Sequence, residues 1–85
     1  MTEKEVIEIA NAALAEEFEL EMEQMVPEAR FNDDLGLDSL DAVDMVVVLE
    51  QEFGFKLRDN QALREIRTLD DLHKYILRKK SELEG

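Results

Sequence analysis

The tetrapeptide Asp38-Ser39-Leu40-Asp41 places a serine between two acids, directly before a segment rich in valine and leucine. A serine in this position can cap a helix, act as a nucleophile or accept a covalent group. Capping by Ser39 is not required, because Asp38 can cap the same helix and Asp41 then lies three residues further on. The residues alone leave the choice between cap and acceptor open.

The nucleophile alternative lacks its usual partners. A catalytic serine needs a positioned base. The one histidine, His73, falls in the last predicted helix, where a lone histidine is ordinarily a surface or boundary residue. The glycines of a G-x-S-x-G turn are missing, since Leu37 and Asp41 stand in their places. A phosphodiester on Ser39 would instead lie at the positive end of a helix dipole, although Asp38 opposes it at close range.

The acid-rich stretch "NDDLGLDSLD" also invites comparison with a calcium-binding loop. With Gly36 at the sixth position of a 12-residue loop, positions 1 and 5 would be Phe31 and Leu35, which carry no ligand oxygen. The spacing therefore argues against an EF-hand. Loose binding of divalent ions by the acids stays open.

The helix predicted from Ser39 to Phe53 has two apolar stripes when plotted at about 100° per residue. One is a core stripe made of Ala42, Met45, Val46, Leu49 and Phe53. The other, nearly opposite, is made of Leu40, Val43 and Val47, with Asp41, Asp44 and Glu50 beside it. This second stripe could pack under a loop or between other helices, or it could dock a partner. Residues 33–52 contain seven acids and no base, which favours docking of a basic partner.

Capping signals and apolar spacing predict an all-α protein. Thr2 with Glu5 marks a helix over residues 3–17, and Gly54 stops the helix that starts near Ser39. Residues 18–38 read as a long ordered connection, a short third helix follows Asp59, and a last helix follows the capping pair at residues 68 and 71. Apolar residues of the connection are expected on the core: Phe18, Met22, Met25, Val26, Phe31 and Leu35. We expect one domain over residues 1–85, a small antiparallel four-helix bundle with residues 81–85 as a flexible tail.

Composition excludes several classes of partner. The 85 residues include 22 acids and 10 bases, for a net charge of −12, which disfavours binding to nucleic acid or to an anionic membrane surface. Residues 1–53 hold 16 acids and 2 bases, whereas residues 54–85 hold 6 acids and 8 bases. There is no cysteine, no signal-peptide pattern and no apolar run long enough to cross a membrane. The lack of cysteine is compatible with a reducing cytosol, and the charge makes a basic protein the natural complement. We expect a cytoplasmic monomer.

The stretch "DDLGLDSLDAVDMVVVLEQEFG", residues 33–54, resembles the signature of acyl carrier proteins, and the similarity extends over most of the chain. The family's four-helix bundle with a long first loop and a short third helix matches the predicted layout. The resemblance implies a non-catalytic carrier in which Ser39 bears 4'-phosphopantetheine. A holo-carrier synthase or another phosphopantetheinyl transferase would attach this arm from coenzyme A. Its thiol would carry acyl groups as thioesters, and Asp38 would belong to the modification motif.

The resemblance also assigns roles to the two stripes of the predicted helix. The surface implied for docking comprises Leu40, Asp41, Val43, Asp44, Val47 and Glu50. The cavity implied for an acyl chain is lined by Phe31, Met45, Val46, Leu49 and Phe53. The implied partners, besides the transferase, are acyl-processing enzymes with basic patches, such as ketosynthases, acyltransferases, ligases and reductases.

Departures from the family pattern concern the pathway. Members devoted to bulk fatty-acid synthesis often have Pro and several acids around the third helix, where this chain reads "LRDNQALREIRT" with Arg58, Arg64 and Arg67. Leu37 stands where small residues are frequent. Fatty-acid synthesis and a specialised lipid or polyketide pathway therefore both remain expectations. A non-carrying interaction module of the same fold is the rival function.

Overall fold

The computed structural model describes residues 2–57 and 64–84, with the side chains of Ser39 and Glu84 outside the described part. Its elements are α1 (Glu3–Glu17), the short 3-10 helix η1 (Met22–Gln24), α2 (Ser39–Phe53) and α4 (Leu69–Glu84). Within these residues there is no strand, and an isolated antiparallel bridge joins Arg30 to Thr68. The described part of the chain is therefore all-α, as predicted.

The caps explain where the helices begin and end. Thr2 and Glu5 form the predicted capping box, so α1 begins at Glu3. Gly54 ends α2 with a φ of 76°, a left-handed conformation that glycine adopts without strain. Both predicted helix ranges, 3–17 and 39–53, are confirmed.

The prediction for the third helix falls mostly on residues 58–63, which lie outside the described residues; Arg64 and Glu65 are helical. The four-helix count therefore stays a prediction. The last helix, α4, extends to Glu84, so residues 81–84 are helical where a flexible tail was expected. No described helix is long and apolar enough to span a bilayer.

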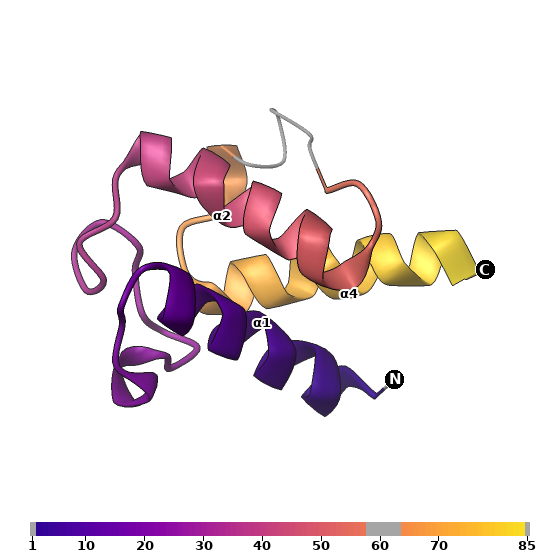
Figure 1. Cartoon of the computed structure of the whole chain (residues 1–85), viewed down its shortest axis with the longest axis horizontal. Helices are drawn as coiled ribbons and strands as arrows, with labels where there is room; N and C mark the ends of the chain where they lie inside the picture. The colour runs from indigo at the N-terminus through magenta and orange to yellow at the C-terminus, as the bar shows by residue number, and fades with distance from the viewer. Residues whose placement is uncertain (1, 58–63, 85) are drawn as a thin grey trace.

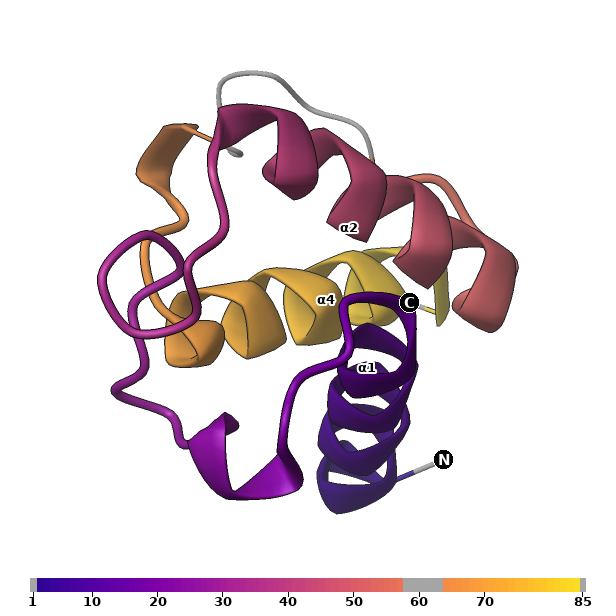
Figure 2. The same ribbon diagram turned by 60° about the vertical axis from the view of Figure 1, so that its left-hand side comes forward.

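The arrangement of the helices is visible from two sides (Figures 1 and 2). α1 packs against both α2 and α4, and α1 runs opposite to the other two in Figure 1. α2 and α4 run in the same general direction, since both begin towards the left of Figure 1 and end towards its right. The antiparallel arrangement expected for the bundle thus holds for α1 with its neighbours but not between α2 and α4.

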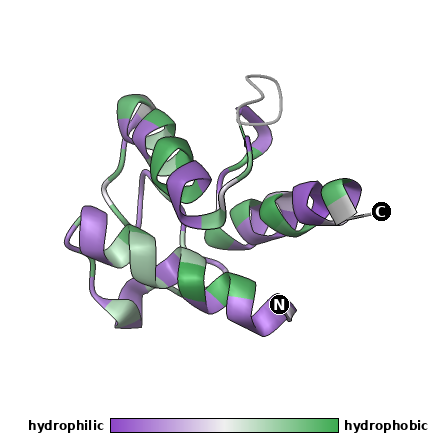
Figure 3. Cartoon of the chain, turned by 45° about the vertical axis from the view of Figure 1, so that its right-hand side comes forward, coloured by the Kyte–Doolittle hydropathy of each residue, from purple (hydrophilic) through white to green (hydrophobic). Residues whose placement is uncertain are grey.

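The core lies where α1, α2 and α4 meet. α1 contributes Val6, Ala10 and Leu14, α2 contributes Met45, Val46 and Leu49, and α4 contributes Leu72 and Ile76. Coloured by hydropathy, α1 and α4 alternate between polar and apolar faces, whereas α2 is largely apolar (Figure 3). α2 therefore has more apolar surface than its core-facing side accounts for, and the remainder is available for another contact.

Backbone hydrogen bonds join the connection between α1 and α2 to the start of α4 and to the residue two positions before it. The backbone N–H of Leu69 donates to the carbonyl of Ala29 at 3.0 Å, and that of Phe31 donates to the carbonyl of Arg67 at 3.1 Å. Met25, Phe31 and Leu35 are buried, as expected. The expectation is wrong for Met22 and Val26, which are 56% and 45% exposed because they lie in and just after η1 on the outside of the connection.

Candidate functional site

The start of α2 is capped by Asp38. Its Oδ1 accepts hydrogen bonds from the backbone N–H groups of Leu40 at 2.9 Å and Asp41 at 3.0 Å. In return, Oδ2 of Asp41 accepts from the N–H of Asp38 at 3.1 Å. Ser39 is the first residue of the helix, one position past the cap. The N-cap position belongs to Asp38, so the N-cap alternative for Ser39 is wrong.

The residues on either side of Ser39 differ in burial. Gly36 has a φ of 68°, and a Cβ built on it would meet nothing within 4 Å, so glycine is needed for conformation rather than for space. The next residue, Leu37, is buried, and its N–H donates to the carbonyl of Phe31 at 2.7 Å. On the other side of Ser39, Leu40 is 77% exposed. Ser39 thus follows an anchored turn and precedes an exposed helical surface.

His73 does not belong to this site. Its ring is buried, with only 4% of the residue exposed, and Nε2 lies 2.7 Å from Oδ1 of Asn11 on α1. Burial lowers the pKa of His73 below 6.5, and the nearby Asp70 opposes this shift. The expectation of a surface or boundary position is wrong. The histidine links α4 to α1 within the core, and hydrolase chemistry gains no base from it.

The second stripe of α2 is open to solvent at its start. Leu40 and Val43 are exposed, Val47 is half-buried, and the neighbouring Asp44 is exposed. The alternative in which this stripe packs inside the protein is therefore wrong for Leu40 and Val43. Asp41, half-buried, serves the capping box as well. We call Leu40, Asp41, Val43, Asp44 and Val47 the outer face of α2.

Glu50 differs from the other residues expected on the docking surface. It is half-buried, and its Oε2 accepts a hydrogen bond from the backbone N–H of Leu57 at 2.8 Å. This contact holds the segment that leaves α2 against the helix. The structure therefore gives Glu50 an internal role beside any role in docking.

The acidic surface continues from α2 onto α1, which sequence reasoning missed. A shallow depression of about 500 Å³ is lined by Glu16 and Glu17 of α1 together with Asp44, Val47 and Glu52 of α2. Spacing along one helix could not reveal this, because it depends on how α1 and α2 pack. Acids of both helices thus lie beside the outer face of α2. No group of three or more potential metal ligands occurs among the described residues.

The residues expected to line an acyl cavity are packed side chains. Phe31, Met45, Val46 and Leu49 are at most 7% exposed and belong to one core cluster, and the half-buried Phe53 packs against it. An acyl chain could enter among them only if the helices parted. Their role with an acyl chain stays a prediction.

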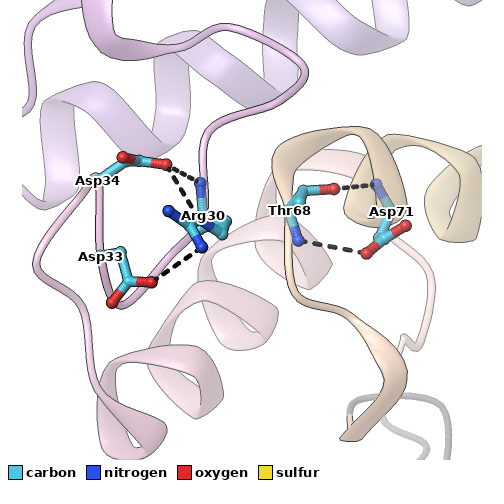
Figure 4. A network of polar contacts seen from close by, with 5 residues as sticks. All are labelled: Arg30, Asp33, Asp34, Thr68 and Asp71. Carbon is cyan, nitrogen blue, oxygen red and sulfur yellow. Dashed lines mark hydrogen bonds and ion pairs between the residues drawn. The ribbon is translucent and has the colours of Figure 1, made fainter.

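A groove of about 770 Å³ lies beside the first turns of α2. It is lined by Arg30, Phe31, Asn32, Asp33, Asp38, Ala42, Val43, Arg64, Ile66 and Arg67. Among the residues expected in the acyl cavity, Phe31 alone is in this lining. One of the groove's cations is already paired, since Arg30 contacts Asp33 and Asp34 at 3.2 and 3.6 Å (Figure 4).

The start of α2 thus places Ser39 at the head of an acid-rimmed, partly exposed helix in a small helical fold. Comparison with known proteins identifies the family. Residues 11–76 match the family described as "Phosphopantetheine attachment site". The acyl carrier protein of Thermosynechococcus vestitus (strain NIES-2133 / IAM M-273 / BP-1) is 37% identical over 76 residues, covering 89% of this chain and 93% of that protein. The acyl carrier protein of Cyanidioschyzon merolae (strain NIES-3377 / 10D) is 36% identical over 83 residues, covering 98% and 90%.

The chain therefore belongs to the acyl carrier protein family, and its cofactor is phosphopantetheine. The described residues fit that group. Asp38 supplies the cap, the flanking Leu40 is exposed, and an open groove begins beside the same turn. A covalent arm at the first residue of α2 would have both solvent and a partly apolar surface next to it.

Proposed function

We propose that Ser39 carries 4'-phosphopantetheine and that the protein presents acyl thioesters to enzymes of fatty-acid or related lipid or polyketide synthesis. The observation that carries this proposal is the division of labour at the start of α2. The carboxylates of Asp38 and Asp41 accept the backbone N–H groups of Asp38, Leu40 and Asp41 between them. Because Asp38 is the cap, the helix does not need Ser39 in that role, and the neighbouring Leu40 is exposed.

Attachment requires one exchange of bonds. The Ser39 oxygen loses its proton and forms a bond to phosphorus of coenzyme A, while the bond from that phosphorus to the nucleotide portion breaks. The attached group supplies a thiol, which forms thioesters and which no side chain of this cysteine-free protein offers. The protein itself contributes position: α2 holds the attachment point, and the outer face of α2 orients the carrier on its partner.

The outer face of α2 suits a partner with an apolar patch surrounded by Lys and Arg. Leu40 and Val43 would bury apolar surface, and Asp41 and Asp44 would face the bases. Attraction between exposed charges of this kind speeds association, and salt weakens that attraction. The complex can therefore form quickly and dissociate again. A carrier that visits several enzymes in turn needs such short-lived contacts.

Sheltering of an acyl chain is the remaining part of the proposal. Exposure of a chain to water costs about 0.8 kcal/mol per CH₂ group. Separation of α2 from the core at Met45, Val46 and Leu49 would recover part of this cost. The same separation would disrupt the close packing of those side chains, and this opposing term limits the net gain.

Intact-mass measurement tests the attachment. The protein is incubated with coenzyme A and a promiscuous phosphopantetheinyl transferase, and we expect the mass to rise by one phosphopantetheine. Ser39→Ala is expected to abolish the gain, whereas Ser81→Ala, at an exposed serine of α4, is the matched control and should leave it intact. A parent protein that stays unmodified, yet binds a basic partner through the outer face of α2, would favour the non-carrying module.

A further inference from the structure

The groove beside the start of α2 has walls of different chemistry. Ala42 and Val43 of α2, with Phe31 and Ile66, give it apolar surface. Arg64 and Arg67 come from the segment before α4 and give it cationic surface. Its volume of about 770 Å³ is within the range of roughly 300–1,000 Å³ of small-molecule sites. The groove could therefore hold more than a single charged group.

The charges of this groove are unevenly satisfied. Arg30 pairs with Asp33 and Asp34, and Asp38 accepts two backbone hydrogen bonds of α2. Within the described residues, by contrast, no ion pair or side-chain hydrogen bond occupies the guanidinium of Arg64 or Arg67. Two uncompensated cations thus share one groove in a protein whose net charge is −12.

An alkyl chain would match only half of this lining. It would cover Val43 and Ile66 favourably, but it would offer the two arginines no hydrogen-bonding partner. A chain that is apolar along its length and ends in a carboxylate matches both halves. Arginine suits this role because its planar fork can donate two parallel hydrogen bonds to one carboxylate.

We propose, on the basis of the proposed carrier function, that the groove receives acyl cargo ending in a carboxylate and that Arg64 and Arg67 bind that carboxylate. The phosphodiester of the arm is the competing anion. It would be fixed to the residue after Asp38, which lines the same groove as the arginines, so the test must separate the two anions. A phosphate group alone would also leave the apolar part of the groove unfilled. The cargo assignment accounts for both parts of the lining.

The test compares two six-carbon cargoes that differ in one end group. A promiscuous transferase loads the full-length protein from coenzyme A, hexanoyl coenzyme A or adipoyl coenzyme A. Thermal unfolding is then followed for the apo, holo, hexanoyl and adipoyl forms. We expect the adipoyl form to unfold about 4 °C above the hexanoyl form at low salt, the shift that one favourable charged contact gives a domain of this size. High salt should reduce the difference.

The variant carrying Arg64→Gln and Arg67→Gln should lose the difference between adipoyl and hexanoyl forms. Both residues are exposed, so the exchange should leave the fold intact. The matched control carries Lys4→Gln and Lys56→Gln, which removes the same charge at two exposed positions outside the groove. This control should keep the difference, and loss of the difference there would reduce the effect to net charge and overturn the proposal.

Two further results would overturn the inference. Equal unfolding temperatures of the hexanoyl and adipoyl forms in the parent would show that the groove does not distinguish the end groups. The arginine variant could also lower the unfolding temperature of the holo form as much as that of the adipoyl form, each relative to the parent. That result would assign the arginines to the phosphodiester. Failure of the parent to accept any arm would be a different result, because it would overturn the proposed function and the inference with it.

Discussion

At the scale of single residues, Asp38 and Ser39 divide structure and function between neighbours. Asp38 accepts two backbone hydrogen bonds at the start of α2. We therefore expect Asp38→Ala to lower the free energy of unfolding by about 1 kcal/mol, the usual cost of losing an N-cap. Ser39→Ala should change it by less than about 0.5 kcal/mol, because alanine is well tolerated at a first helical position.

Urea unfolding of the two apo variants measures this difference. The comparison uses the apo protein so that the arm has no influence on stability. If Ser39→Ala proved as destabilising as Asp38→Ala, the serine would have a structural role, and its availability for modification would lose its main support.

A second prediction at this scale concerns His73. Its pKa is lowered by burial, so the folded protein binds fewer protons than the unfolded chain once the pH falls below about 6.5. Stability should therefore decrease as the pH falls through this value and stop decreasing on this account below the lowered pKa of the folded state. Asp70 opposes the shift and limits its size.

The measurement compares the parent with His73→Gln, which retains a hydrogen-bond donor near Asn11. Urea unfolding at pH 7.5 and pH 5 should show a larger loss for the parent than for the variant. The carboxylates titrate in both proteins, so their contribution cancels in the difference. Parallel losses in the two proteins would contradict the assignment to His73.

The sequence predicts some of these residue roles and not others. Asp38 could be recognised as a cap because capping depends only on residues within one turn. The burial of His73 could not, because its neighbour Asn11 is 62 positions away. The same holds for Arg64 and Arg67, whose approach to Ala42 and Val43 depends on how segment 64–67 packs beside α2.

At the scale of elements, Leu57 anchors the chain where it leaves α2. Its side chain is 1% exposed, its N–H donates to Glu50, and its carbonyl accepts from the hydroxyl of Tyr75 on α4. The segment after α2 is thus tied to two helices by one residue. Any movement of this segment would have to break these contacts.

Tyr75→Phe tests the anchor. The ring would remain, together with its contacts to the cationic groups of Arg78 and Lys79, and only the hydroxyl would be removed. We expect the free energy of unfolding to fall by about 1–3 kcal/mol, because the carbonyl of Leu57 would lose a partner in the interior. Denaturant unfolding measures this loss. A variant as stable as the parent would mean that water or another group replaces the hydroxyl.

Elements defined by local signals are those the sequence predicts best. The boundaries of α1 and α2 follow from caps and a glycine stop. η1 was not predicted, because three residues carry too little periodicity. The extension of α4 through residues 81–84 was also missed. Leu83 is 65% exposed, so helix propensity and the contact of Lys79 with Glu82 at 3.8 Å, rather than core packing, support this end.

At the scale of the whole molecule, charge could attract a basic partner in two ways. The net charge of −12 acts at a distance on any basic surface, whereas the outer face of α2 acts only at the contact. Asp44 belongs to that face, and Glu23 is another exposed acid in η1, which lies away from α2 in Figures 1 and 2. Reversal of either charge changes the net charge by the same amount.

The last prediction separates the two effects. Asp44→Lys should lower kcat/KM for arm attachment by a phosphopantetheinyl transferase roughly threefold to tenfold at low salt, because an attractive contact becomes repulsive. Glu23→Lys should change it less than about twofold, since only the long-range field is altered. The gap between the variants should narrow as salt is raised. Equal losses would show that net charge guides the encounter, and the outer face of α2 would then have no special role in docking.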